Sequence, residues 1–437
     1  MSPAKSPVAF AGLGAMGFGM ASHLVKSGFP VIAYDIYPPS IDKLVAVGGR
    51  AAVTPRVAVR DVDFLVCMVP KIDDAMDLLF DPASGAVTSM RKNASLLITS
   101  TVAPADITML LSRLEEAERS DIHLLDCPVS GGAGRAANGT LSIFASGHDA
   151  HLDTAHPILE CMSSKLYRVP GGLGGGSKAK LIHQIFAGVN IAMASEAMGL
   201  AAMAGLNTQQ AFDKLSEGDG SSWMFCNRVP HMLDPSLPPY SAIAIIKKDV
   251  AIITKTIREY SFRLPLLEKS EELYQECSNS GWEREDDCAV VRLYMPGQPE
   301  LVAEHAKSWQ GHDQPRMSIN EIESLMTGVH LAVINEAMRF CERLGIDTDL
   351  MFDIVSNAAG SSAAFTKYFQ RMQKDAWLLR SIPGVIDLRD RLVGSSHCHY
   401  HRCTDMLQAS ARAKASDLGY KMDLSSIARR TFQDQLS

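Results

Sequence analysis

The 437-residue sequence lacks most features that mark secreted, membrane-bound or nucleic-acid-binding proteins. Its nine cysteines include no Cys-x-x-Cys pair, and free thiols in a reducing compartment are the simplest interpretation of their odd number. The net charge is −7 and the sequence contains no basic stripe. Both observations argue against nucleic acid or an anionic membrane as a partner. The opening residues MSPAKSPVAFAGLG have no signal-peptide pattern, and we expect a cytoplasmic protein.

Long hydrophobic runs are also scarce. The most membrane-like stretch, residues 185–206, contains Asn190 and Glu196, and a carboxylate near the centre of a span costs about 3 kcal/mol. We therefore predict a buried helix there and no membrane partner. The remaining composition, with 46% hydrophobic and 21% charged residues, is typical of a globular protein, and the length indicates two to four domains.

A glycine turn near the N-terminus predicts a dinucleotide site. From Val8 the chain reads as a strand, a turn that matches G-x-G-x-x-G, a helix and a second strand. Gly12 permits the tight turn, Gly14 lets the backbone approach a pyrophosphate, and Gly17 lets the helix pack close to the strand. The helix start then offers N–H groups and a positive dipole end to phosphate. The residues expected to contact cofactor here are Gly12, Leu13, Gly14, Ala15, Met16 and Gly17.

Asp35 ends the second strand, at the spacing from Gly12 expected of a carboxylate that accepts hydrogen bonds from the ribose hydroxyls. No arginine or lysine follows until Lys43, so a 2′-phosphate would meet repulsion and no cation. We therefore predict NAD as the cofactor in preference to NADP. The alternative is a glycine turn that serves only helix packing and binds no ligand.

Three further apolar runs, at 63–70, 95–104 and 123–132, end in small or polar residues. This pattern is typical of buried parallel strands whose carboxyl ends face a ligand crevice. Each end is explicable alone as turn chemistry, but together they indicate a site. We expect the Ser130 hydroxyl and the neighbouring N–H groups to hold a substrate carboxylate. The residues at these ends are Val69, Pro70, Ser100, Thr101, Ser130, Gly131 and Gly132.

The glycine-rich run PGGLGGGSKAK, residues 170–180, predicts a hinge before a helical region. Helical spacing then places Lys180, His183 and Gln184 so that they project together into the cleft. A dehydrogenase needs a base that takes a hydroxyl proton while hydride leaves the same carbon, and a lysine can serve if burial and a positive nicotinamide lower its pKa. Two alternatives stay open: a solvated lysine at a helix start, and His183 as the base or as a satisfied core residue.

These motifs resemble the β-hydroxyacid dehydrogenase family, which includes 3-hydroxyisobutyrate dehydrogenase and is related to 6-phosphogluconate dehydrogenase. The resemblance covers about residues 7–295 and is carried by GLGAMGFGMA, MVP, STVAP, DCPVSGG, the G-x-G-x-x-x-K run ending at Lys180, and KKD at 247–249. It implies an α/β Rossmann domain followed by an all-α domain. It also implies roles for individual residues: Lys180 as catalytic acid/base, Ser130, Gly131 and Gly132 as substrate contacts, Thr101 beside the nicotinamide, and Lys248 closing over the cofactor.

One departure narrows the resemblance. The family usually has an asparagine four residues after the lysine, where this chain has Gln184 preceded by His183. KLIHQIFAGV, SSWMFCNRVPHML and EDDCAVVRLY instead resemble the L-threonate dehydrogenase branch, which oxidises four-carbon sugar acids with NAD. A longer, hydroxylated substrate implies that His183, Gln184 and Asn227 each bond a hydroxyl, and such sites discriminate strongly against analogues that lack it.

The predicted function is therefore NAD-dependent oxidation of a small hydroxy acid such as L-threonate. The alternatives are a 3-hydroxyisobutyrate dehydrogenase, an NADPH-dependent reductase of small aldehydes or keto acids, and a non-catalytic dinucleotide-binding scaffold.

The sequence of the helical region contains an internal repeat. Residues 188–222 and 328–362 share 14 of 35 positions at a constant offset of 140. At that offset Lys180 falls on Asn320, His183 on Glu323, Gln184 on Ser324 and Asn227 on Lys367. Packing residues persist while the chemical residues are replaced, so we expect the second copy to bind no cofactor and to perform no catalysis.

The predicted fold is an α/β Rossmann dinucleotide-binding domain followed by two tandem all-α 6-phosphogluconate-dehydrogenase-like helical domains. Because helical domains of this family commonly pair between subunits, the fused copy predicts either a pseudo-dimeric monomer or a homodimer. The predicted boundaries are 1–172 for the Rossmann domain, 173–296 for the catalytic helical domain, 297–317 for a linker and 318–437 for the degenerate copy.

The run SSHCHYHRC, residues 395–403, is the one sequence feature that suggests a metal. On a strand, alternate histidines and Cys403 would share one face. Structural zinc sites more often join two separated pairs, and the surroundings look helical or loop-like, so we predict no metal.

Overall fold

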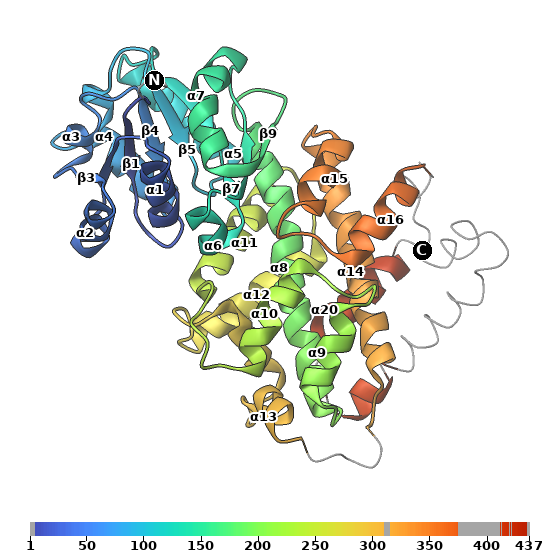
Figure 1. Cartoon of the computed structure of the whole chain (residues 1–437). Helices are drawn as coiled ribbons and strands as arrows, with labels where there is room; N and C mark the ends of the chain where they lie inside the picture. The colour runs from blue at the N-terminus through green and yellow to red at the C-terminus, as the bar shows by residue number, and fades with distance from the viewer. Residues whose placement is uncertain are drawn as a thin grey trace. The chain divides into compact units, whose positions relative to one another are not determined.

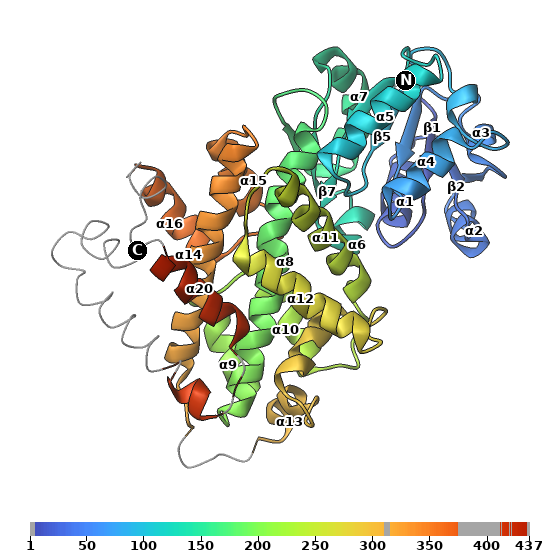
Figure 2. The same cartoon turned by 180° about the vertical axis from the view of Figure 1, so that it is seen from behind.

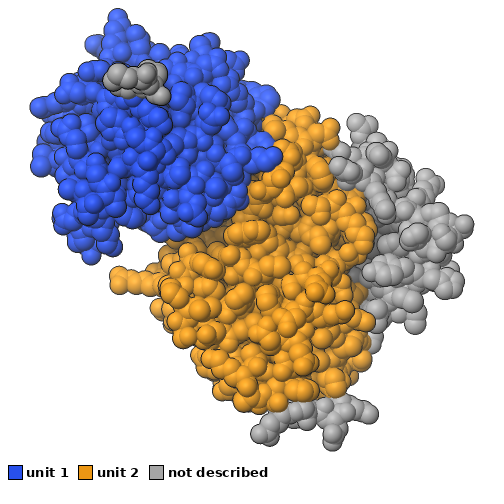
Figure 3. All heavy atoms as spheres, in the orientation of Figure 1, with its two compact units in different colours: residues 1–181 blue, residues 182–437 orange. Residues whose placement is uncertain are grey.

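Contacts within the chain divide it into two units, residues 1–181 and residues 182–437, and each is described by itself (Figure 3). The computed structural model describes residues 5–309, 315–374, 411, 413–418, 420 and 422–434. The predicted boundary between Rossmann and helical domains, at 172, lies close to the boundary between the units. The histidine-rich run at 395–403 lies outside the described residues.

Unit 1 is built around a parallel sheet with strand order β3-β2-β1-β4-β5-β6. The chain runs outward from β1 to β3 and then returns to β4 on the other side of β1 (Figure 1). In such sheets the ligand crevice opens where the strand order reverses, at the carboxyl ends of β1 and β4. The strands are β1 Val8–Ala11, β2 Val31–Tyr34, β3 Arg50–Ala51, β4 Phe64–Cys67, β5 Ser95–Ile98 and β6 His123–Asp126.

Helices cover both faces of this sheet because alternate strand residues point to opposite sides. Phe10 belongs to a hydrophobic cluster with residues of α1 and α7, whereas its neighbour Ala9 belongs to a second cluster with residues of α4 and α5. The predicted alternation of buried strands and helices is confirmed. The helices of unit 1 are α1 Gly17–Lys26, α2 Pro38–Ala46, α3 Pro55–Ala58, α4 Ile72–Phe80, η1 Val87–Ser89, α5 Pro104–Glu116, α6 Gly132–Ala137 and α7 Asp149–Cys161.

The predicted strand at 123–132 is in fact two strands in different sheets. Strand β6 ends at Asp126, and Pro128, which has no N–H to donate, precedes β7 (Val129–Ser130). Strand β7 pairs antiparallel with β8 (Leu141–Ala145), which pairs parallel with β9 (Ser163–Arg168). This three-stranded sheet was not predicted, and it fixes the backbone of Ser130 opposite Ser142.

The described part of unit 2 is helical (Figures 1 and 2). Helix α8 begins before the unit boundary and continues through it. It is long and apolar enough to cross a membrane. Its most apolar segment is nevertheless entirely buried inside the protein, as predicted for a core helix. The helices are α8 Gly175–Met203, α9 Thr208–Ser216, α10 Trp223–Leu233, α11 Ile243–Glu259, α12 Pro265–Asn279, η2 Asp287–Tyr294, α13 Leu301–Lys307, α14 Ile319–Arg343, α15 Thr348–Ser356, α16 Ala363–Lys374 and α20 Asp423–Asp434.

Local structure repeats at the same offset of 140 as the sequence. Helix α15 starts and ends 140 residues after α9, and α16 starts 140 residues after α10. The caps repeat as well: the Ser222 hydroxyl accepts from the N–H of Phe225 at 3.1 Å, and Ser362 accepts from Phe365 at 3.1 Å. The stretch predicted as a linker, 297–317, contains the short helix α13.

Candidate active site

The glycine turn between β1 and α1 has the geometry of a phosphate cradle. Gly12 has φ +92°, and a Cβ there would collide with the Met68 carbonyl oxygen. A Cβ on Gly17 would collide with the carbonyl oxygen of Gly12, whereas one on Gly14 would meet no atom within 4 Å. No side chain caps the start of α1, and a helix N-terminus of this kind is a common binding site for phosphate. These residues fit a dinucleotide pyrophosphate.

Asp35 is tied to this turn. Its carboxylate accepts from the N–H of Leu13 at 2.5 Å and from the N–H of Tyr37 at 2.7 Å. Each carboxylate oxygen has a further lone pair. Asp35 can therefore accept hydrogen bonds from ribose hydroxyls while it keeps both bonds to the backbone. The Leu13 side chain is buried in the core, so any contact of this residue with cofactor is through its backbone. Ala15 is exposed and Met16 is half-buried.

The ends of β4 and β5 are joined by a residue that was not among the predicted contacts. The Ser100 hydroxyl accepts from the N–H of Val69 at 3.0 Å and donates to the Val69 carbonyl at 2.7 Å. Beside it, Pro70 is exposed and Thr101 is half-buried. Ser100 therefore holds the segment that carries two predicted cofactor contacts, Val69 and Pro70. Its position at a strand end had suggested only that it lies near the site.

The predicted carboxylate-binding residues lie at the end of β7 and directly after it. Ser130 is buried, with its backbone paired to Ser142, and has 4% of its surface exposed. Gly131 has φ +139° and Gly132 has φ +74°, conformations that favour glycine. Glycine is therefore required at both positions by the backbone conformation. The turn that these two residues make lies where the predicted carboxylate-binding N–H groups are.

Helix α8 is anchored at its start by Asp126. The carboxylate accepts from the Ser177 N–H at 2.7 Å and from the Ser177 hydroxyl at 2.8 Å. Ser146 links to the same carboxylate at 3.2 Å and accepts from the N–H of Gly176 at 2.8 Å. Burial raises the pKa of Asp126 to about 6, against the opposing hydrogen bonds. A carboxylate suits a helix N-terminus, where N–H groups and the dipole are positive.

Lys180 lies three residues after Ser177 on α8, and only 5% of its surface is exposed. Lysine is almost never fully buried unless it is paired. Its burial argues against the alternative of a solvated lysine at a helix start. The anchored first turn fixes the backbone from which this amine projects.

One turn further along α8, a hydrogen-bonded chain connects four polar residues of unit 2. His183 Nδ1 lies 3.0 Å from Gln184 Oε1, and Gln184 Nε2 donates to Asp249 Oδ2 at 2.6 Å. Lys248 Nζ lies 3.0 Å from Asp249 Oδ1. The structure thus connects His183 and Gln184 with Lys248 through Asp249, the last residue of the KKD motif and one that was not singled out from the sequence.

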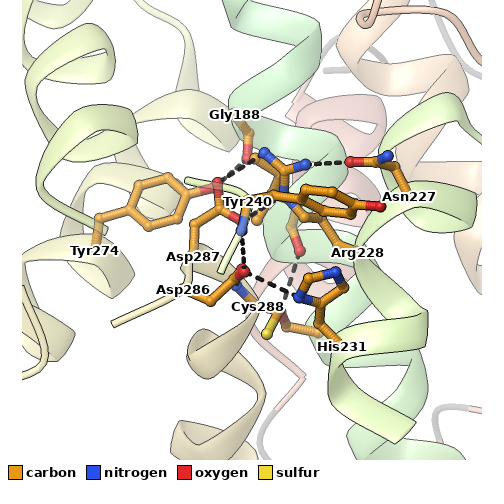
Figure 4. Close-up of polar contacts among 11 residues, drawn as sticks. Gly188, Asn227, Arg228, His231, Tyr240, Tyr274, Asp286, Asp287 and Cys288 are labelled. Carbon is orange, nitrogen blue, oxygen red and sulfur yellow. Dashed lines mark hydrogen bonds and ion pairs between the residues drawn. The ribbon is translucent and has the colours of Figure 1, made fainter. Parts of the chain in front are cut away.

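Asn227 lies at the edge of a buried ionic cluster on α10 (Figure 4). Arg228 donates from Nε and Nη2 to the two oxygens of Asp287, at 2.5 and 3.0 Å, and from Nη1 to Asn227 Oδ1. Burial raises the pKa of Asp287 to about 6, while Arg228 opposes that rise. Because Arg228 occupies the amide oxygen, the Asn227 NH₂ group is turned the other way. The segments SSWMFCNRVPHML and EDDCAVVRLY meet at this cluster.

Two other expectations concern thiols and metals. The seven cysteines that the structure describes are free. Among the described residues no group of three histidine, cysteine, aspartate or glutamate side chains is arranged to hold a metal ion.

Comparison with known proteins decides the family. Residues 7–171 match the NAD-binding domain of 6-phosphogluconate dehydrogenase. Residues 174–294 and, again, 321–379 match the NAD-binding domain of NADP-dependent 3-hydroxyisobutyrate dehydrogenase. L-threonate dehydrogenase of Cupriavidus necator is 36% identical over 293 residues, which are 66% of this chain and 97% of that protein. The chain belongs to the β-hydroxyacid dehydrogenase family.

Two proteins of known structure resemble this chain in different ways. A 3-hydroxyisobutyrate dehydrogenase from Salmonella typhimurium is 35% identical, with a TM-score of 0.62, and covers 66% of this chain and 100% of its own. A 6-phosphogluconate dehydrogenase from Plasmodium falciparum covers 99% of this chain and 93% of its own, with a TM-score of 0.68 at 12% identity, which shows a shared fold alone. The chain is a hydroxyacid dehydrogenase with a nicotinamide dinucleotide cofactor.

Proposed function

We propose that this dehydrogenase oxidises a four-carbon sugar acid such as L-threonate with NAD, and that Lys180 is the general acid/base. One observation carries the proposal: a lysine with only 5% of its surface exposed lies one turn after the residue of α8 that Asp126 anchors. The similarity to L-threonate dehydrogenases, at 32–36% identity over nearly their full length, supports the substrate class.

The chemistry assigns a task to each residue. A bound nicotinamide would supply the hydride acceptor for the carbon that bears the reacting hydroxyl. Lys180 Nζ, in its neutral form, takes the hydroxyl proton, and it returns a proton in the reverse direction. Ser130 and the N–H groups of Gly131 and Gly132 hold the substrate carboxylate. The Asn227 NH₂ group, which Arg228 orients, donates to a further hydroxyl.

The preference for NAD rests on Asp35. Its carboxylate would bond the ribose hydroxyls of NAD and repel the 2′-phosphate of NADP. Thr101 beside the nicotinamide and Lys248 over the cofactor complete the proposed contacts. A second candidate substrate, 3-hydroxyisobutyrate, is favoured by the names of the matching family model and of the similar Salmonella structure.

We also propose that residues 318–437 are a degenerate copy of the helical domain at 173–296, and that the two copies make a pseudo-dimer. The Trp223 N–H donates to the Ser361 carbonyl, and the Ala363 N–H donates to the Ser221 carbonyl, both at 2.9 Å. At the offset of 140 these bonds exchange with each other, as contacts about a two-fold axis do. We expect the protein to be located in the cytoplasm. We expect it to be either a monomer or a homodimer.

The proposal is tested by steady-state turnover of the full chain with L-threonate, D-threonate, D-erythronate and 3-hydroxyisobutyrate, followed by NADH or NADPH absorbance. We expect the highest kcat/KM for a tetronic acid with NAD, and a value for 3-hydroxyisobutyrate lower by about a hundredfold or more, because it leaves hydroxyl-binding groups unpaired. A preference for 3-hydroxyisobutyrate would favour the second candidate. No turnover with intact NADH binding would favour a scaffold.

A further inference from the structure

The loop between α15 and α16 lies against α8 through the backbone of Gly360. Its N–H donates to His183 Nε2 at 3.0 Å, and its carbonyl accepts from Asn190 Nδ2 at 3.3 Å. The two partners are seven residues apart, so they lie on one face of α8. A Cβ at position 360 would lie 3.0 Å from the His183 carbonyl oxygen and 3.2 Å from Phe186 Cβ. Glycine therefore allows this close approach.

The contact from Gly360 determines where the proton of His183 is. A backbone N–H can only donate, so Nε2 must be the acceptor and carries no hydrogen. The neutral ring then carries its proton on Nδ1, which donates to Gln184 Oε1 at 3.0 Å. With its oxygen occupied, Gln184 presents its NH₂ group to Asp249 Oδ2 at 2.6 Å. One donor thus sets the direction of every bond as far as the carboxylate that pairs with Lys248.

We propose that Gly360, a residue of the second helical copy, is a positioning residue for the active site of the first. Its N–H holds His183 as the neutral Nδ1–H tautomer and thereby fixes the Gln184 amide and the Asp249 carboxylate. Because both ring nitrogens are engaged, His183 orients Gln184 and does not itself act as the base. The part of this inference that concerns catalysis rests on the proposed function.

The opposite side of the pseudo-dimer supplies a comparison within the same molecule. Gly220, the counterpart of Gly360 at the offset of 140, lies against α14 in the same way, with a Cβ position 2.8 Å from Met326 Cβ and 3.0 Å from the Glu323 carbonyl. There the loop N–H of Asp219 donates to Glu323 Oε1 at 2.9 Å. Glu323 takes the place of His183, and Ser324 that of Gln184. The packing is shared by both sides, while the tautomer-setting bond belongs to one.

The tautomer is measured directly by long-range ¹H–¹⁵N NMR of the full chain labelled at its thirteen histidines, with the His183 signal assigned by its loss in His183→Gln. We expect a neutral ring with its proton on Nδ1 in the wild-type protein. A ring protonated on Nε2 in the wild-type protein would overturn the proposal before any variant of Gly360 is made.

The role of the second copy is measured with a matched pair of variants. Gly360→Ala pushes the loop away from His183, and we expect the His183 signal to change tautomer or to average between tautomers, with kcat/KM for the hydroxy acid lowered about tenfold. Gly220→Ala makes a similar packing change on the other side and should leave both the signal and kcat/KM within twofold of wild type. Equal losses in the two variants, with an unchanged His183 signal, would reduce the contact to packing and contradict the proposal.

The two proposals fail separately. If no hydroxy acid is turned over but His183 shows the Nδ1–H form and responds to Gly360→Ala alone, the proposed function fails and the positioning of His183 stands. If L-threonate is turned over and His183 carries its proton on Nε2, the function stands and the positioning role is wrong.

Discussion

Asp126 shows how a single buried side chain holds the first turn of helix α8. Its carboxylate holds both the N–H and the hydroxyl of Ser177, one turn before Lys180. Burial raises its pKa from 3.8 to about 6, so the folded protein binds a proton that the unfolded chain has already lost between these pH values. The free energy of unfolding therefore falls as pH rises through this window and levels off above about 6.

Asp126→Asn removes this titration. Between pH 5 and 7 the wild-type protein should lose about 1 kcal/mol of unfolding free energy relative to the variant. Urea unfolding at several pH values, followed by circular dichroism, measures this difference. A constant difference between wild type and variant over that range would show that Asp126 does not titrate as its burial implies.

Asp35→Asn tests cofactor choice at the same scale. Removing the carboxylate charge should lower the ratio of kcat/KM with NAD to that with NADP by about tenfold or more, since repulsion of the 2′-phosphate is lost. Asp42→Asn, which removes an exposed charge on α2, is the control and should leave the ratio unchanged. An unaltered ratio in Asp35→Asn would refute the assignment of NAD preference to this residue.

At the scale of elements, two buried glutamates hold the starts of two helices. Glu196 on α8 accepts from the N–H groups of Leu424 and Ser425, at 2.7 and 3.1 Å, at the start of α20. Glu336, its counterpart on α14 at the offset of 140, accepts from the N–H of Leu266 at 3.2 Å, at the start of α12. Under the proposed duplication, α20 is the counterpart of α12. The C-terminal stretch gave no such signal, because its repeat is too faint to align.

Glu336 gives this element a pH dependence. Burial raises its pKa from 4.5 to about 8, so the fold favours the protonated acid and loses stability as pH rises toward 8. Glu336→Gln keeps the acceptor for Leu266 without the titration. Between pH 6 and 9 the wild-type protein should lose about 2–3 kcal/mol of unfolding free energy that Glu336→Gln does not lose.

Thermal or urea unfolding across this pH range provides the measurement for Glu336. Glu342→Gln, at an exposed position on the same helix, should follow the wild-type protein. Parallel curves for Glu336→Gln and wild type would show that Glu336 does not titrate in this pH range and would contradict the predicted pH dependence.

At the scale of the whole molecule, local patterns were the predictable part. The strands at 63–70 and 95–104 and the buried helix at 185–206 follow from apolar runs and glycine turns, which are short-range signals. The bonds of Asp126 to Ser177 and of Gly360 to His183 join residues 51 and 177 positions apart, and no periodicity reports such pairs. The break at Pro128 was not predicted, and the sheet beyond it depends on pairing with β8 and β9.

The division of labour between the two copies is the central claim, and it depends on the amine of Lys180. The deciding measurement is the turnover of L-threonate with NAD by Lys180→Met, which keeps the buried chain length but has no base, beside Lys178→Met on the same helix. We expect kcat to fall about 10²- to 10⁴-fold in Lys180→Met alone. NADH binding, measured by fluorescence titration, should be unchanged in both variants. Near-normal turnover in Lys180→Met would contradict the central claim.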